Sequence, residues 1–155
     1  MKELAQLATF ALGGHEYALD IMRIKEIINP LKITPVPRAP GFIEGVVELR
    51  GAIIPIVDLR KRFDLSPVPP TRASKYVIVA IERNIIGLVV DAVGEVLRVA
   101  AGELRSPPSL VNGDGPSPFS AVCRRPGRLI MVLDIDRILT SREKMTLAGL
   151  AELPA

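Results

Sequence analysis

Aromatic and sulfur-containing side chains are scarce in this sequence. Aromatic residues make up 4% of the 155 residues and tryptophan is absent, so few rings are available to stack on nucleic-acid bases. The formal net charge of +3 is too small to indicate a polyanionic partner. The single cysteine, Cys123, excludes an internal disulfide framework and fits a reducing compartment. No nucleic-acid partner is therefore expected.

The residues of common catalytic and metal sites are also missing. Nucleophilic catalysis usually requires a histidine base, and the only histidine, His15, lies beside the Gly13-Gly14 turn. One histidine and one cysteine do not complete a zinc site. Asp58 and Asp134 each follow an apolar strand and precede a helical turn, where an aspartate caps free backbone N–H groups. We therefore expect no enzyme activity, no cofactor and no metal.

Long apolar runs are absent too. No uncharged apolar run reaches the roughly 18 residues that indicate a membrane span, and the N-terminus lacks the features of a signal peptide. Hydrophobic residues nevertheless make up 48% of the chain, as in an ordinary folded protein. These patterns predict a cytoplasmic protein with no direct membrane insertion, folded as a single domain over residues 1–155.

What the sequence contains instead is a series of β-strand patterns separated by glycine and proline. Apolar, β-rich segments flank short turns, as in hairpins. We expect hairpins at 6–21, 46–57, 75–92 and 119–133, and a further strand at 93–100. We expect a short helical or irregular piece at 22–28, a helical turn at 59–63 and a C-terminal helix within 135–150. A proline-rich connector at 66–74 and a long loop at 106–118 complete the prediction.

The order of these segments repeats once. In each half a hairpin leads to an apolar–x–Glu–apolar segment, 24–27 and 93–96, and then to a second hairpin that ends in an aspartate. Two barrels of about five strands would each have a marginal core, so we expect them to share one. The predicted fold class is mainly β, with approximate subdomains at 16–80 and at 81–140 plus the N-terminal strand. Strand exchange between the barrels stays open.

Two features suggest a binding surface. Apolar residues that follow the first hairpin of each half could line the seam between the barrels, or they could all be core; these seam residues are Ile24, Ile27, Ile28, Val36, Val93 and Val96. At the tip of the second hairpin, Gly51 supplies backbone freedom for the turn. Arg50 either fills that turn or is displayed for a partner.

Four ordered blocks resemble the CheW family, the scaffold proteins of bacterial chemosensory arrays. They are "TFALGGHEYALDIMRIKEII", "ITPVPRAPGFIEGVVELRGAIIPIVDLRKRF", "IIGLVVDAVGEVLRV" and "LIMVLDIDRIL". The resemblance implies two SH3-like five-stranded β-barrels around a hydrophobic core, with short helices and a C-terminal helix. It also implies a non-enzymatic adaptor that couples chemoreceptors to the histidine kinase CheA.

The resemblance further implies partners, a location and site residues. The partners would be the chemoreceptor cytoplasmic tip, the regulatory domain of the kinase and other CheW-like proteins in array rings, and the arrays lie at the inner membrane. The family's usual asparagine is Glu48 here, and strand alternation predicts that Glu48 and Arg50 share a face and could pair. The expected receptor- or kinase-binding residues are Ile24, Glu26, Ile27, Val36, Glu48, Arg50, Gly51 and Val96.

Two alternatives remain at this point. A CheW-like paralogue could bind receptors without activating the kinase. In a different class, a small-barrel protein could contact nucleic-acid phosphates through two basic clusters, 60–62 and 124–128, which contain Arg60, Lys61, Arg62, Arg124, Arg125 and Arg128.

Overall fold

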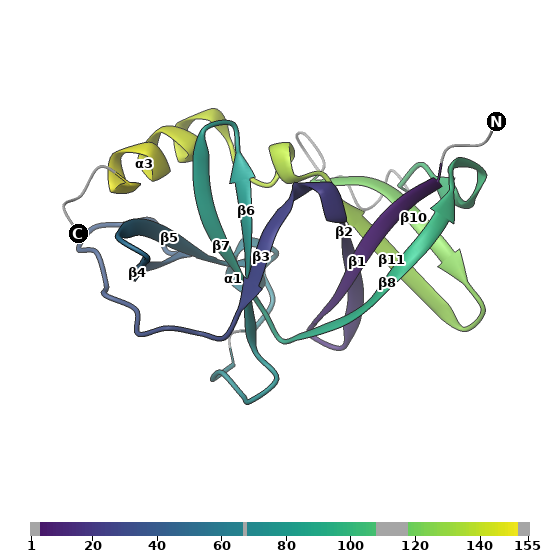
Figure 1. The fold of residues 1–155 in the computed structure, drawn as a ribbon, viewed down its shortest axis with the longest axis horizontal. Coiled ribbons are helices and arrows are strands. Elements are labelled where there is room, and N and C mark those ends of the chain that lie inside the picture. The colour runs from purple at the N-terminus through teal and green to yellow at the C-terminus, as the bar shows by residue number, and fades with distance from the viewer. Residues whose placement is uncertain (1–3, 67, 108–117, 152–155) are drawn as a thin grey trace.

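The protein consists of two strongly curved β-sheets that lie side by side along its long axis (Figure 1). The computed structural model describes residues 4–66, 68–107 and 118–151. Within these residues all four predicted hairpins are present, and each is antiparallel. The predicted mainly β class is confirmed.

Sheet B contains five strands in the order β3-β6-β7-β5-β4. Its outer strands are β3 and β4, and β5 pairs in parallel with β7. The strands are β3 (Ile24–Ile28), β4 (Ile43–Leu49), β5 (Ala52–Asp58), β6 (Lys75–Ile81) and β7 (Asn84–Val90).

Sheet A contains six strands in the order β8-β1-β2-β11-β10-β9, and β2 pairs in parallel with β11. One strand more than predicted is present because the short segment β9 pairs with β10. The strands are β1 (Leu4–Leu12), β2 (His15–Asp20), β8 (Ala92–Ala100), β9 (Leu104–Arg105), β10 (Phe119–Arg125) and β11 (Arg128–Leu133). Below, barrel A and barrel B denote the subdomains built on these two sheets.

The two halves of the sequence exchange strands. The first hairpin, β1–β2, joins the strands β8 to β11, whereas β3 to β5 join the hairpin β6–β7. The chain therefore changes sheets after Asp20 and again after Val90. The expected boundary at residues 80/81 instead falls inside the β6–β7 hairpin, where direct hydrogen bonding between neighbouring strands keeps them in one sheet.

A shared hydrophobic core lies between the barrels. One cluster fills the interior of each barrel, and a third, larger cluster takes side chains from both sheets, including Phe10 and Leu19 of sheet A and Val77 and Leu88 of sheet B. Burying such a side chain stabilises the fold by about 1.5–3 kcal/mol. The barrels thus depend on each other for burial, as the sequence predicts.

Most of the few aromatic rings are used in this core. Four of them stack or tilt against one another with ring centroids 5.5–6.1 Å apart: Phe10, Tyr17, Phe63 and Phe119. Three of them lie on β1, β2 and β10 of sheet A, and Phe63 ends the short helix that follows β5, so the rings tie that helix to sheet A. Such packing contributes beyond simple area burial.

Short helices connect and cover the sheets. The helix α1 (Leu59–Arg62) begins where β5 ends, as predicted, and α3 (Ser141–Ala151) packs over sheet B through Leu147 and Leu150 (Figure 1). A capping box precedes α3, because the Thr140 hydroxyl accepts from Glu143 N–H and the Glu143 carboxylate accepts from Thr140 N–H. The described residues also contain three 3₁₀ turns, η1 (Ile21–Arg23), η2 (Ala101–Glu103) and η3 (Ile135–Arg137).

The prediction for residues 22–28 is only partly correct. The 3₁₀ turn η1 ends at Arg23, and the rest of this stretch is the strand β3, which pairs with β6. A partner strand that lies far along the sequence overrides the weak local preference. Most of the predicted loop at 106–118 falls outside the described residues.

Candidate functional site

The segment after β3 closes barrel B. It crosses to β4, where Thr34 and Val46 exchange backbone hydrogen bonds of 2.8 and 2.9 Å. Gly45 permits this close approach: its φ is +146°, and a Cβ atom there would lie 2.3 Å from the Thr34 carbonyl oxygen. The glycine of the "GVVELRG" block therefore allows the two outer strands of sheet B to be joined around one barrel.

Arg50 and Gly51 form the two-residue tip of the β4–β5 hairpin. Leu49 lies opposite Ala52, and the φ values of Arg50 and Gly51 are +50° and +82°. Positive φ at both central positions is the pattern of a type I′ turn. For a residue other than glycine this conformation costs roughly 1–2 kcal/mol. The turn thus accommodates Gly51 readily, as predicted, and holds Arg50 against its local preference.

The side chain of Arg50 reaches from the β4–β5 hairpin tip to Glu26 on β3. The end of barrel B between these two residues is called its mouth below. The two side chains form an ion pair, and their exposed fractions are 69% for Arg50 and 33% for Glu26. Glu26 lies at a β-bulge of β3. Ile24 pairs with Val79 and Glu26 pairs with the adjacent Ile78, so Lys25 is the extra residue. The pair therefore links the hairpin tip to the opposite outer strand.

Arg50 pairs with Glu26 and not with Glu48, the residue with which strand alternation suggested that it could pair. Glu48 is exposed on β4 opposite Ile53, whereas Arg50 lies in the turn with positive φ. Because the turn takes Arg50 out of the regular alternation of the strand, the two side chains no longer share a face by the period-two rule. The partner of Arg50 is Glu26 on a different strand.

The seam residues divide into packed and exposed positions. Ile24 and Val36 pack against the shared core, and Ile28 packs against the interior cluster of barrel B. Ile27 on β3 is 41% exposed and Val96 on β8 is 49% exposed. Val93 is exposed as well. Both readings of these residues thus apply, because half of them serve the core and half present apolar surface to solvent.

Most of the predicted site lies on barrel B. The structure brings Glu26 and Arg50 into contact and places Ile27 one residue from Glu26, with Gly51 beside Arg50. Val96 belongs to β8 of sheet A, opposite Ala8 of β1. The binding roles of Ile24, Glu26, Ile27, Val36, Glu48, Arg50, Gly51 and Val96 stay predictions.

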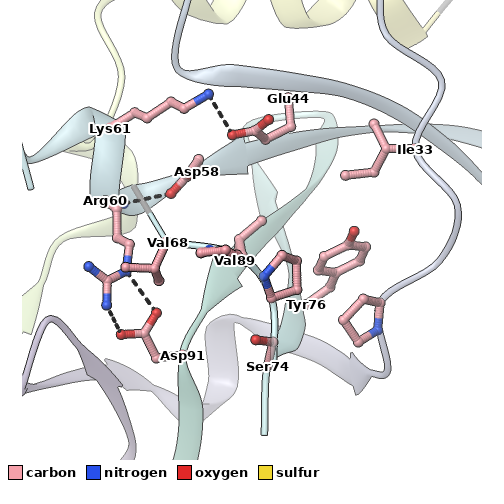
Figure 2. Close-up of a pocket in the computed structure, with 13 residues that line it drawn as sticks. Ile33, Glu44, Asp58, Arg60, Lys61, Val68, Ser74, Tyr76, Val89 and Asp91 are labelled. Atoms are coloured by element: carbon pink, nitrogen blue, oxygen red, sulfur yellow. Dashed lines mark hydrogen bonds and ion pairs between the residues drawn. The ribbon is translucent and has the colours of Figure 1, made fainter. Parts of the chain in front are cut away.

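A cavity of about 190 Å³ lies beside α1 (Figure 2). Charged residues from β4, β5 and α1 line it together with apolar side chains such as Val68 and Val89. Lys61 pairs with Glu44 at 2.8 Å, and Asp58 accepts a 2.9 Å hydrogen bond from the Arg60 backbone N–H. The latter bond is the predicted helix cap. The charges in this cavity are therefore largely matched within the chain.

Two carboxyl groups of this cavity have opposite pKa shifts. Burial raises the pKa of Asp58, and its hydrogen bond with Glu44 raises it further. Burial also acts to raise the pKa of Asp91, but hydrogen bonds from the Arg60 side chain and from Gly13 N–H outweigh it, so that pKa lies below its usual range. The sequence alone did not indicate this network, because its members come from four separated segments.

Most cations of the two basic clusters, 60–62 and 124–128, form ion pairs with carboxylates of the same chain. Of the six cations, five form ion pairs within the described residues, which leaves little free positive charge for phosphate groups. The pairs are Arg60–Asp91, Lys61–Glu44, Arg62–Glu143, Arg125–Glu103 and Arg128–Glu16. This arrangement disfavours a nucleic-acid partner.

The single cysteine and the single histidine give no further candidate site among the described residues. Cys123 is fully buried and His15 is exposed at the start of β2. Among the residues that the structure describes, no group of three or more His, Cys, Asp or Glu side chains is arranged to hold a metal ion. In the same part of the chain, no helix has the length and apolar character needed to cross a membrane.

Comparison with known proteins gives consistent matches over nearly the whole chain. Residues 6–143 match the family model described as a CheW-like domain. The chain is 36% identical to the chemotaxis protein CheW of Treponema pallidum, covering 96% of this chain and 89% of that protein. It is 34% identical to the chemotaxis protein CheW of Thermotoga maritima, covering 86% and 87%. The crystal structure of scaffolding protein TtCheW from Thermoanaerobacter tengcongensis matches with a TM-score of 0.82 at 30% identity, covering 91% of this chain and 96% of that chain.

Proposed function

This chain belongs to the family of CheW-like domain proteins, and we propose that it is a non-enzymatic adaptor that couples chemoreceptors to a CheA-type histidine kinase. The observation that carries the proposal is the family match over residues 6–143, which includes strands of both barrels. The relatives are chemotaxis proteins, and one solved relative is a scaffolding protein. A scaffold requires docking surfaces on a stable frame, and two barrels with a common core provide such a frame.

The proposed receptor-binding surface combines the braced mouth of barrel B with exposed apolar positions. Arg50 stands at a hairpin tip in a locally unfavourable conformation, with its side chain largely exposed. Ile27 and Val96 add apolar surface, which is typical of sites that receive a helix or hairpin tip. Glu26 orients Arg50, while Ile24 and Val36 support the surface from the core side. These features support a contact with the chemoreceptor tip.

The adaptor would work within a receptor array at the inner membrane. Its partners would be the chemoreceptor tip, the regulatory domain of the kinase and further CheW-like proteins in the array rings. The chain would reach the membrane only through these partners. A labelled copy of the protein should co-localise with the receptors and should disperse when the receptors are deleted.

Reconstitution with the purified cognate partners tests this function. The protein is mixed with a cytoplasmic fragment of the receptor and with the kinase, and kinase autophosphorylation is measured. We expect a higher rate than in the same mixture without the protein. Failure to bind both the receptor fragment and the kinase regulatory domain would overturn the proposal.

Glu48 favours one second candidate within the same family. The residue is exposed on β4, two positions before Arg50, where the family usually has asparagine. A carboxylate at this position could select a particular partner or exclude one through repulsion. In that case the protein would bind receptors without activating the kinase. Separate pull-downs with the receptor fragment and with the kinase regulatory domain distinguish the two candidates, because the second predicts capture of the receptor fragment only.

A further inference from the structure

Barrel A has an ionic link across its strands, as barrel B does. Arg128, the first residue of β11, donates two hydrogen bonds of 2.8 and 2.6 Å to the carboxylate of Glu16 on β2. Its Nη1 atom donates a third, of 2.6 Å, to Oε1 of Glu95 on β8. In sheet A, the strands β1 and β2 lie between β8 and β11. Through Glu95, Arg128 therefore connects β11 with β8, two strands that have no direct backbone pairing.

Glu95 lies at a β-bulge of β8. Val96 pairs with Ala8 and Val93 pairs with Phe10, so Gly94 and Glu95 together face the single residue Thr9. The Thr9 hydroxyl donates a 2.7 Å hydrogen bond to the backbone carbonyl of Glu95. A Cβ atom at Gly94 would lie 2.5 Å from that hydroxyl oxygen. Two contacts thus hold the bulge. The buried Thr9 holds the backbone carbonyl of Glu95, and Arg128 holds the Glu95 side chain.

This arrangement repeats the one in barrel B. Glu26 and Glu95 each occupy the third position of an apolar–x–Glu–apolar segment, each lies at a bulge, and each pairs with an arginine of a later hairpin in the same barrel. The arginines are not at the same place in their hairpins. Arg50 lies within its turn, whereas Arg128 follows the Pro126-Gly127 turn. The repeat in the sequence is therefore matched by a repeated brace at the two bulges.

We propose that Glu95 and Arg128 are positioning residues that hold the β8 bulge so that Val93 and Val96 are presented to the chemoreceptor tip. This inference rests on the proposed function and adds a second braced strand to the proposed receptor surface. Val93 and Val96 flank the bulge directly and are both exposed. The occupant is an apolar helical tip, because β8 presents two valine side chains there and the carboxylate between them, Glu95, is already paired with Arg128.

The brace acts on geometry more than on stability. The Glu95 side chain is 58% exposed, and an ion pair this exposed contributes little to folding. Glu16 is the matched control, since it binds the same arginine but lies on β2, which β11 already pairs with directly. Removing the Glu16 charge therefore leaves the link between Arg128 and β8 in place. Thr9→Val gives an independent variant, because it removes the hydrogen bond to the Glu95 carbonyl and changes no charge.

The test compares Glu95→Gln, Glu16→Gln and Thr9→Val with the wild-type protein. Binding to the receptor cytoplasmic fragment and to the kinase regulatory domain is measured separately, together with amide hydrogen exchange at residues 94–96. We expect roughly three- to tenfold weaker receptor binding for Glu95→Gln and Thr9→Val. Exchange at the bulge should be faster in these two variants, while kinase binding stays close to wild type. The melting temperature should stay close to wild type for Glu95→Gln and fall by a few degrees for Thr9→Val, which leaves a part-buried carbonyl without its donor. Glu16→Gln should match wild type in receptor binding and in exchange at the bulge.

The possible failures are distinguishable. Wild-type protein that does not bind the receptor fragment would overturn the proposed function and this inference with it. Wild-type binding that Glu95→Gln leaves unchanged would overturn this inference alone. Equal weakening by Glu16→Gln would also overturn it, because the effect would then come from the charge of the cluster and not from the link to β8. Weaker binding to the kinase regulatory domain with unchanged receptor binding would overturn it as well, because β8 would then contact the kinase.

Discussion

Arg50 and Glu26 form an ion pair although they lie 24 positions apart in the sequence. The pair joins a turn residue with positive φ to the bulge of the opposite outer strand, across the mouth of barrel B. An arginine in this conformation gains no local stabilisation from the turn. An arginine at this position is understandable if the exposed guanidinium serves a partner, with Glu26 setting its direction.

Substitution of Arg50 should separate binding from stability. Arg50→Glu places a second carboxylate beside Glu26, so we expect weak binding to the receptor fragment. The melting temperature should change by only a few degrees, because an exposed ion pair contributes less than about 1 kcal/mol. Arg50→Asn is the control that removes the charge and suits the positive φ. It should melt at the wild-type temperature or higher and still bind less well. A joint loss of folding and binding in both variants would show that Arg50 is structural.

Gly45 should not tolerate a side chain. Gly45→Ala brings a Cβ atom within 2.3 Å of the Thr34 carbonyl oxygen, and the closing bridge of barrel B must move. We expect destabilisation by about 2–4 kcal/mol in urea unfolding. Gly149→Ala is the matched control, because Gly149 lies in α3 and the added methyl group would meet no atom within 4 Å beyond its chain neighbours and its own helix backbone. There alanine should stabilise the protein by about 0.5–1 kcal/mol. Equal effects of the two substitutions would refute the account of the barrel closure.

Asp58 and Asp91 should affect the pH dependence of stability with opposite signs. The pKa of Asp58 is raised by burial and by Glu44, so the stability it contributes is present below its ordinary pKa and is lost as pH rises through the raised value. The pKa of Asp91 lies below its ordinary value because its bonds from Arg60 and Gly13 outweigh the effect of burial. Its contribution is present above the ordinary pKa and is lost as pH falls through the lowered value.

Urea unfolding from acidic to neutral pH checks these signs. Asp58→Asn keeps an acceptor for the Arg60 N–H, so relative to wild type this variant should become more stable as pH rises. Asp91→Asn should become less stable relative to wild type over the same range. Asp58→Ala serves as control for the cap and should be about 1 kcal/mol less stable than Asp58→Asn at neutral pH. Parallel profiles of the two asparagine variants would contradict the assigned shifts.

Val96 should matter for binding more than for folding. The side chain is 49% exposed on β8, an outer strand of sheet A. Val96→Asp is expected to weaken binding to the receptor fragment by at least roughly tenfold, because a desolvated carboxylate disfavours an apolar contact. The unfolding free energy should fall by no more than about 1 kcal/mol. Met145→Asp on α3 is the control, since Met145 is exposed and lies outside the proposed surface. Similar binding by the two variants would remove Val96 from the site.

The sequence predicted the local features of this protein well. The four hairpins, the caps at Asp58 and Asp134, and the turn conformation of Gly51 all follow from interactions between residues close in the chain. Alternating apolar residues and turn formers carry enough information for such elements. The ordered family blocks were likewise sufficient to predict the fold class and the family.

The candidate site could be predicted only in part for the same reason. Glu26 and Arg50 were both expected in it, but their contact was not, because it depends on how β3 lies relative to the β4–β5 tip. The links from Arg128 to Glu95 and from Lys61 to Glu44 also join distant segments. The repeat of 24–27 in 93–96 was the one signal that pointed toward the second brace.

By itself the sequence determined most of the strands, their turns and the division into two similar halves, since these depend on side-chain period and on backbone preferences at single residues. Only the tertiary structure decided that the halves exchange hairpins, that Arg50 pairs with Glu26 and not with Glu48, and that most of the basic clusters are neutralised. These outcomes depend on which surfaces meet when both barrels bury one core. Such contacts join residues far apart in the chain, so no short segment of the sequence predicts them.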